Sequence, residues 1–121
     1  MNPLVLLTGA LKYNNLDYLS EVKTDLIMFR NLFEEIYGYE VYSTYDQNKP
    51  ETELLTLNQF DLFLKQHCIN NKEKNYDSLI FIWCGHNDDK YKLFKKVQEL
   101  FTNIFLNKPK IFIKNIYQKN E

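Results

Sequence analysis

The residues of this chain best suited to chemistry come at the end of its most apolar run. The run Leu79–Cys84 has the pattern of a buried strand, and Gly85 and His86 follow it directly. A glycine allows a sharp exit from the strand, so that an imidazole is presented at the rim of a sheet. Because histidine titrates near neutral pH, His86 is a candidate general base. The alternative is a half-buried histidine that only packs and forms hydrogen bonds.

The other reactive side chains have simpler interpretations. Cys84 lies within the strand, where a thiol more often acts as a small hydrophobic group than as a nucleophile. His67 and Cys68 are expected to end a surface helix, with a capping or surface role. Asp88 and Asp89 are placed to begin the next helix, where carboxylates favour the helix dipole, and a base or metal role is the lesser alternative.

Apolar runs and helical spacings alternate along the chain. Strands are expected at 3–9, 40–45, 79–84 and 110–113, helices at 20–36, 52–67 and 89–105, and a polar loop at 70–76. Ser20 is expected to cap the first helix and Gly38 to follow its last turn. The expected inner faces are Val22, Leu26, Phe29, Phe33 and Ile36; Leu54, Leu57, Phe60 and Leu64; and Leu93, Val97, Leu100 and Ile104.

This order of elements predicts a three-layer α/β sandwich, with a mainly parallel sheet of four strands and helices on both faces. The expected strand order is 2-1-3-4. Chemistry in such sheets takes place at the carboxyl ends of the strands, which selects the segments 8–13, 84–87 and 114–118. Because the third and fourth strands are expected to be neighbours, His86 should lie close to the residues that follow Ile113.

Composition limits the class of protein. The chain has 121 residues, 45% of them apolar and 26% charged, as in a single soluble globular domain. Its net charge of -1 argues against binding to nucleic acid or to an anionic membrane. Arg30 is the only arginine, which excludes sites built from arginine clusters. With two cysteines and two histidines, we expect a reduced, cytoplasmic protein without a metal or another cofactor.

Three stretches, LVLLTGALKYNNLDYLSEVKTDLIMFRNLFEEIYGYEV, DSLIFIWCGHN and KPKIFI, resemble the large-subunit domain of the caspase- and metacaspase-like cysteine peptidases. The matching positions are Asp25, Gly38, Tyr39, Val41, Asp77, Gly85, His86, Lys108, Pro109, Lys110 and Phe112. The resemblance covers nearly the whole chain. It implies a caspase-like fold, a family of cysteine-type endopeptidases, and His86 as the family's general base.

The chain departs from this family at the residues that carry catalysis. The resemblance places Tyr117 at the nucleophile position, where a phenol with a pKa near ~10 supplies no thiolate, so Tyr117 is not expected to act. Asn87 replaces the glycine that follows the family's histidine and helps to shape its oxyanion hole. Because asparagine tolerates a left-handed backbone, the turn of Gly85 and Asn87 can persist even without that oxyanion hole. Leu19 stands where caspases have an arginine for a substrate aspartate. His86 and Tyr117 are 31 residues apart, against ~50 in the family.

We therefore expect residues 1–121 to form one caspase-like large-subunit domain, with a polar tail from about residue 114 and without the small-subunit strands of the family. The expected function is that of a catalytically inactive regulatory or interaction module. Its expected partner is a protein, either a caspase-like relative or a second copy, bound through the edge strand 110–116. The alternative is a truncated or misassigned cysteine endopeptidase that uses His86 with a cysteine absent from this chain.

A receiver or flavodoxin-like domain shares the alternating pattern and is rejected. The first strand ends in Thr8-Gly9-Ala10, without the acidic pair of a receiver, and the residues from Thr8 to Asn14 form no phosphate-binding glycine loop.

Overall fold

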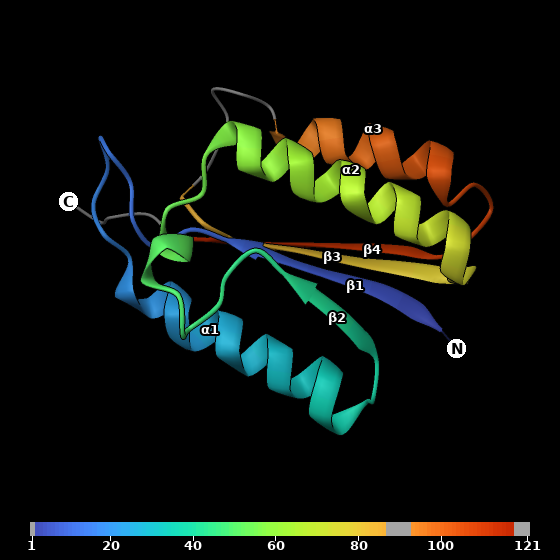
Figure 1. Cartoon of the computed structure of the whole chain (residues 1–121), viewed down its shortest axis with the longest axis horizontal. Helices are drawn as coiled ribbons and strands as arrows, with labels where there is room; N and C mark the ends of the chain where they lie inside the picture. Colours follow the sequence, from blue (N-terminus) through green and yellow to red (C-terminus); the bar gives the residue numbers. More distant parts are fainter. Residues whose placement is uncertain (1, 87–92, 118–121) are drawn as a thin grey trace.

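The computed structural model describes residues 2–86 and 93–117, with only the backbone described for 68–74 and 93. Within these ranges the strands β1 (Pro3–Gly9), β2 (Glu40–Ser43), β3 (Ser78–Gly85) and β4 (Lys110–Ile116) form an all-parallel sheet. Their order is β2-β1-β3-β4, as predicted. The helix α1 (Ser20–Arg30) covers one face, and α2 (Leu57–Lys74) and α3 (Leu93–Ile104) cover the other (Figure 1). The fold is thus a three-layer α/β sandwich.

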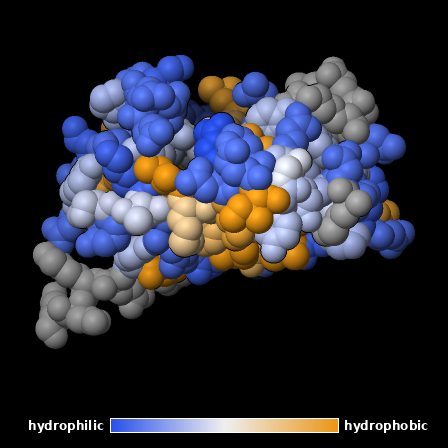
Figure 2. Space-filling model, turned by 90° about the horizontal axis from the view of Figure 1, so that it is seen from below, coloured by the Kyte–Doolittle hydropathy of each residue, from blue (hydrophilic) through white to orange (hydrophobic). Residues whose placement is uncertain are grey.

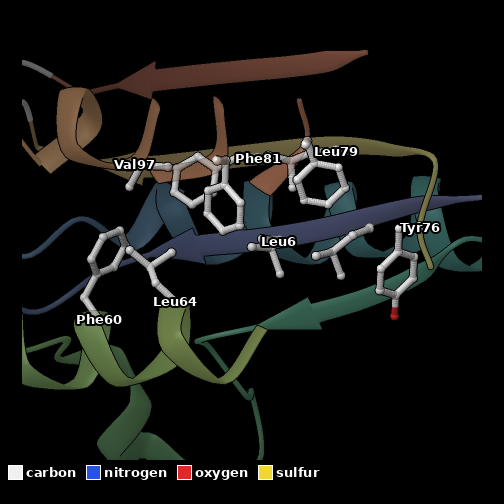
Figure 3. Close-up of a cluster of buried hydrophobic side chains, with 10 residues drawn as sticks. Leu6, Phe60, Leu64, Tyr76, Leu79, Phe81 and Val97 are labelled. Carbon is white, nitrogen blue, oxygen red and sulfur yellow. The ribbon is translucent and has the colours of Figure 1, made fainter. Parts of the chain in front are cut away.

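The two central strands are buried because apolar side chains point to both of their faces. All seven residues of β1 are buried, and so is all of β3 except Trp83, which is half-buried. On the side of α2 and α3, Phe81 lies at the centre of a cluster with Leu6, Phe60 and Val97 (Figure 3). Burial of one such phenylalanine contributes about 1.5–3 kcal/mol. On the side of α1, the cluster contains Val5, Leu7, Val22, Leu26, Ile80, Ile82 and Cys84.

The first helix differs from its prediction at both ends. Its N-cap residue is Leu19 and not Ser20, and no side chain caps it. At its other end the chain widens into a π-helix, η1 (Asn31–Ile36), where the N–H of Tyr37 bonds to the carbonyl oxygen of Leu32. A π-turn holds more residues than an α-turn, so the side chains after it rotate away from the helix face. Ile36 is consequently 74% exposed, and its predicted inward position is wrong.

Gly38 follows η1 with a φ of 71°, which confirms its predicted place after the last turn. The strand after it ends at Ser43, two residues earlier than predicted.

The second helix begins later and ends later than predicted. A short 3₁₀ helix, η2 (Pro50–Glu53), comes first. Thr56 then caps α2, because its hydroxyl accepts the N–H of Gln59 at 3.1 Å while Gln59 Oε1 accepts the N–H of Thr56 at 2.9 Å. Leu57 lies in the first turn and is 43% exposed, so its predicted inward position is wrong. The helix continues to Lys74 through most of the predicted loop 70–76.

The third helix confirms its predicted inner face in part. Val97 is buried and Ile104 packs against the core, whereas Leu100 is 36% exposed. Phe101 and Phe105, which were not predicted, are also buried. The predicted start at Asp89 lies outside the described residues. The strand after it, β4, runs to Ile116, three residues further than predicted, so residues 114–116 belong to the sheet and not to a tail. Residues 118–121 of the predicted tail lie outside the described part of the chain.

Candidate functional site

The carboxyl ends of β3 and β4 lie side by side and bring the two principal candidates to one edge of the sheet. Gly85 at the end of β3 pairs with Ile116 at the end of β4. His86 and Tyr117 are the residues that directly follow these two strands. The backbone N–H of Tyr117 donates to the carbonyl oxygen of Gly85 at 3.0 Å. The predicted proximity of His86 to the residues after Ile113 is therefore confirmed.

The imidazole of His86 is oriented by the loop that follows β1. Its Nε2 atom lies 3.0 Å from the backbone carbonyl oxygen of Asp17. Because a carbonyl oxygen only accepts, Nε2 carries the proton in this arrangement and Nδ1 is the basic nitrogen of the neutral ring. Among the described residues, none forms a hydrogen bond with Nδ1.

Tyr13 holds both the backbone and the ring of His86. Its hydroxyl oxygen accepts the backbone N–H of His86 at 3.0 Å. The edge of one ring also faces the other, with centroids 4.6 Å apart and planes at 75°. On the other side of the turn, Trp83 Nε1 donates to the carbonyl oxygen of His86 at 3.1 Å. These contacts fix the exit of the chain from β3.

Gly85 is required here because a side chain has no room. A Cβ atom at this position would collide with the Tyr13 hydroxyl and would lie 3.0 Å from the indole ring of Trp83. The sequence suggested a glycine for a sharp exit. The structure adds a steric reason, since Gly85 allows Tyr13 to approach the backbone closely.

Cys84 is unsuited to nucleophilic chemistry. It is fully buried in the cluster on the α1 side, and burial raises the pKa of its thiol to about 12. The amide Nδ2 of Asn115 lies 4.0 Å from the sulfur. That amide donates to Asp25 on α1 at 3.0 Å. A thiol in this setting stays protonated at neutral pH and acts as a core residue.

The remaining predicted candidates lie at different places. Tyr117 follows β4 at the same edge as His86, and its half-buried side chain packs against the α1-side cluster. Cys68 lies in α2, which covers the face of the sheet opposite to α1. Asn87, Asp88 and Asp89 lie outside the described residues, so the predicted turn of Gly85 and Asn87 is described only at Gly85.

The surface role predicted for His67 is wrong. Its side chain is only 2% exposed and lies between the rings of Tyr42 and Phe63, with centroid distances of 4.4 and 4.3 Å. Desolvation by burial lowers the pKa of His67 to about 4. Because α2 continues past this residue, His67 faces the core from within the helix and does not cap it.

Two contributors to the site were not singled out as residues by the sequence. Tyr13 is the last residue of the segment 8–13, which the carboxyl end of β1 selected. Asp17 lies in a polar loop outside the selected segments and acts through its backbone, so no feature of the sequence indicated it.

Among residues 2–86 and 93–117, no three His, Cys, Asp or Glu side chains gather as a metal site requires. No helix in the described ranges is long and apolar enough to cross a membrane. No protein-family model and no curated protein matches the chain.

Proposed function

We propose that this chain is a caspase-like domain without a nucleophile of its own, which acts as a regulatory interaction module and not as a peptidase. One observation carries the proposal. The residue beside the candidate base His86, at the end of the neighbouring strand, is Tyr117. A phenol is a far weaker source of an attacking anion at neutral pH than a cysteine thiol.

The contacts of His86 support the proposed relationship to the caspase-like family. The imidazole is held at Nε2 by the carbonyl oxygen of Asp17, which leaves Nδ1 as the basic nitrogen. This arrangement is compatible with a general base, and the neighbouring phenol could not use one as a cysteine would.

The native thiols do not replace the missing nucleophile. Cys84 is buried, with a pKa of about 12, and its side chain belongs to the core. Cys68 lies in α2, whose layer is separated by the sheet from the α1 side. Neither residue is placed to receive help from His86.

Peptidase assays test the catalytic part of the proposal. The wild-type chain, incubated with fluorogenic peptides that carry Arg, Lys or Asp at the cleavage position, is expected to show no turnover above that of the His86→Ala variant. Turnover by the wild type that His86→Ala abolishes would contradict the proposal.

A cysteine placed at position 117 tests whether His86 occupies a general-base site. In the Tyr117→Cys variant, the alkylation rate by iodoacetamide should follow a thiol pKa below the ordinary ~8.5, and His86→Ala in the same chain should raise it again. Tyr37→Cys, at an exposed tyrosine directly after η1, is the matched control. An ordinary pKa at position 117, unchanged by His86→Ala, would argue against the family relationship.

The Nδ1 atom, which bonds to none of the described residues, favours a second candidate, a peptidase whose cysteine is not in this chain. Sequencing of the transcript beyond the Ile113 codon distinguishes the two. A cysteine codon three or four positions further on would restore the enzyme, and its absence supports the inactive domain.

A further inference from the structure

The outer edge of β4 is the longest unpaired strand edge that the described residues contain. Its seven residues span about 23 Å at the usual rise of a strand, whereas the other edge strand, β2, has four residues. β4 is also much less buried than β1 and β3. An all-parallel sheet normally has both faces covered, so this half-exposed edge is unusual.

The exposed part of β4 is apolar on the α1 side. Ile111 pairs with Ile80 and Ile113 with Ile82, so both isoleucines point to the α1 face of the sheet. The helix α1 packs over β1 and β3, and Ile111 is 49% exposed. Figure 2, which views the molecule from the α1 side, shows hydrophobic surface at several places on this face, the largest area near its centre.

The hydrogen bonds between β4 and β3 determine which backbone groups of β4 point to the outer edge of the sheet. The Tyr117 N–H donates toward β3, and the Pro109 carbonyl oxygen accepts from Leu79 of β3. Since backbone groups alternate in direction along a strand, the odd-numbered residues of β4 face β3. The N–H and C=O groups of the even-numbered residues therefore point to the free edge; these residues are Lys110, Phe112, Lys114 and Ile116.

The two lysines do not block this edge. Lys110 Nζ donates to the carbonyl oxygens of Phe105 and Lys108 at 2.9 Å, and Lys114 Nζ lies over the ring of Phe94 at 5.5 Å. Both ammonium groups are thus directed back onto their own chain. Charged lysines that project from an edge strand discourage pairing, and here that protection is weakened.

We infer that a second copy of this chain pairs with β4 in antiparallel orientation, about a two-fold axis that passes between the two Ile113 residues. This partner deepens the interaction role proposed above and rests on it. The axis is perpendicular to the sheet, so the exposed isoleucines of both copies stay on the same face. The result is a continuous eight-stranded sheet with a central apolar strip.

The lysine positions and the length of β4 favour this alignment of the two strands over its neighbours. Ile113 is the midpoint of β4, so pairing about it uses all seven residues. Lys114 then lies opposite Phe112 of the second copy, and Lys110 lies opposite Ile116. A shift of the axis to Phe112 would place Lys110 opposite Lys114, and like charges in directly opposed positions are destabilising. A shift to Ile111 would pair only three residues of each strand.

Cross-linking tests the register. In a Cys68→Ser background, Ile113→Cys should form a disulfide-linked dimer under mild oxidation, because opposed residues that are not hydrogen-bonded have Cα atoms about 4.5 Å apart. Ile111→Cys is the matched control, since its two copies would be four residues out of register and should stay monomeric. Dimer formation by Ile111→Cys in place of Ile113→Cys would overturn the inference.

The oligomeric state tests the surface itself. Light scattering of the wild-type chain should give roughly twice the 14.6 kDa of one chain. Lys114→Pro removes one outward N–H without touching a bond to β3 and should yield monomers, whereas Lys114→Ala keeps that N–H and should remain dimeric. Circular dichroism verifies that both variants are folded. A wild-type chain that stays monomeric at millimolar concentration would overturn the inference.

These outcomes are separable from those of the proposed function. A monomeric chain that still binds a caspase-like relative would refute the self-pairing and leave the interaction role intact. Peptidase turnover dependent on His86 would refute the proposed function whatever the oligomeric state.

Discussion

The Nε2 atom of His86 lies 3.0 Å from the carbonyl oxygen of Asp17, a residue 69 positions earlier in the chain. This contact joins the loop after β1 to the end of β3, and Tyr13 strengthens the same junction through the N–H of His86. The candidate site is therefore built across two strands, and its stability can be measured apart from any activity.

Tyr13→Phe should destabilise the fold by about 1 kcal/mol, because the N–H of His86 loses its hydrogen-bond acceptor while the ring contact is kept. Urea unfolding monitored by circular dichroism measures the change. Tyr18→Phe serves as the control, since its hydroxyl bonds to Glu53 at an exposed position, and it should change the free energy of unfolding by less than about 0.5 kcal/mol. Equal effects of the two substitutions would contradict the role given to Tyr13.

Gly85→Ala should cost about 1–3 kcal/mol, because the new Cβ would collide with the Tyr13 hydroxyl and crowd Trp83. Since Tyr13→Phe removes the oxygen involved, the cost of Gly85→Ala should be smaller in that background. A double-mutant cycle of unfolding free energies measures the difference. Strict additivity of the two substitutions would show that the close approach of Tyr13 to Gly85 is not what requires the glycine.

Cys84 should react only when the chain unfolds. In a Cys68→Ser background, labelling of the native protein by Ellman's reagent at pH 8 should be at least about a thousandfold slower than in denaturant. Burial excludes the reagent, and a pKa of about 12 leaves little thiolate. Rapid native labelling that His86→Ala slows would instead identify Cys84 as an activated thiol.

The sheet was predictable because each central strand is a continuous apolar run. The runs 3–9 and 79–84 are typical of strands buried on both faces of a parallel sheet, and alternation with helices leaves few strand orders. The juxtaposition of His86 with Tyr117 follows from that order. The same rule selected the segment that contains Tyr13 but gave it no role, and Asp17 lies in a loop without periodicity.

The helix faces were less predictable, for separate physical reasons. The π-turn of η1 interrupts the 3.6-residue repeat that placed Ile36 inside. The second helix passes through a polar segment with two asparagines, so the end placed near His67 was too early. The capping box of Thr56 and Gln59 was present in the sequence and marks the true start.

The shift caused by η1 can be tested with two apolar residues that periodicity assigns to the same face. Leu26→Ala should cost about 2–5 kcal/mol, because Leu26 is 1% exposed and its loss leaves a cavity. Ile36→Ala should change the free energy of unfolding by less than about 0.5 kcal/mol, because Ile36 is 74% exposed. Similar costs for the two variants would mean that the helix face continues without the π-turn.

His67 should make the fold sensitive to acid. Its pKa is about 4 in the folded chain and near 6.5 when unfolded, so the unfolded state binds more protons between these values. The stabilisation from keeping the ring neutral is complete above pH 6.5 and is lost as the pH falls toward 4. On this basis His67 accounts for a decrease on the order of 2 kcal/mol between pH 7 and pH 4.

The His67→Leu variant tests this assignment, because it removes the titrating group from the space between Tyr42 and Phe63. The unfolding free energy of the variant should be lower than that of the wild type at pH 7, but it should fall less steeply between pH 7 and pH 4. Urea unfolding of both proteins at half-unit steps of pH measures the two slopes, and parallel slopes would show that His67 is not the group responsible.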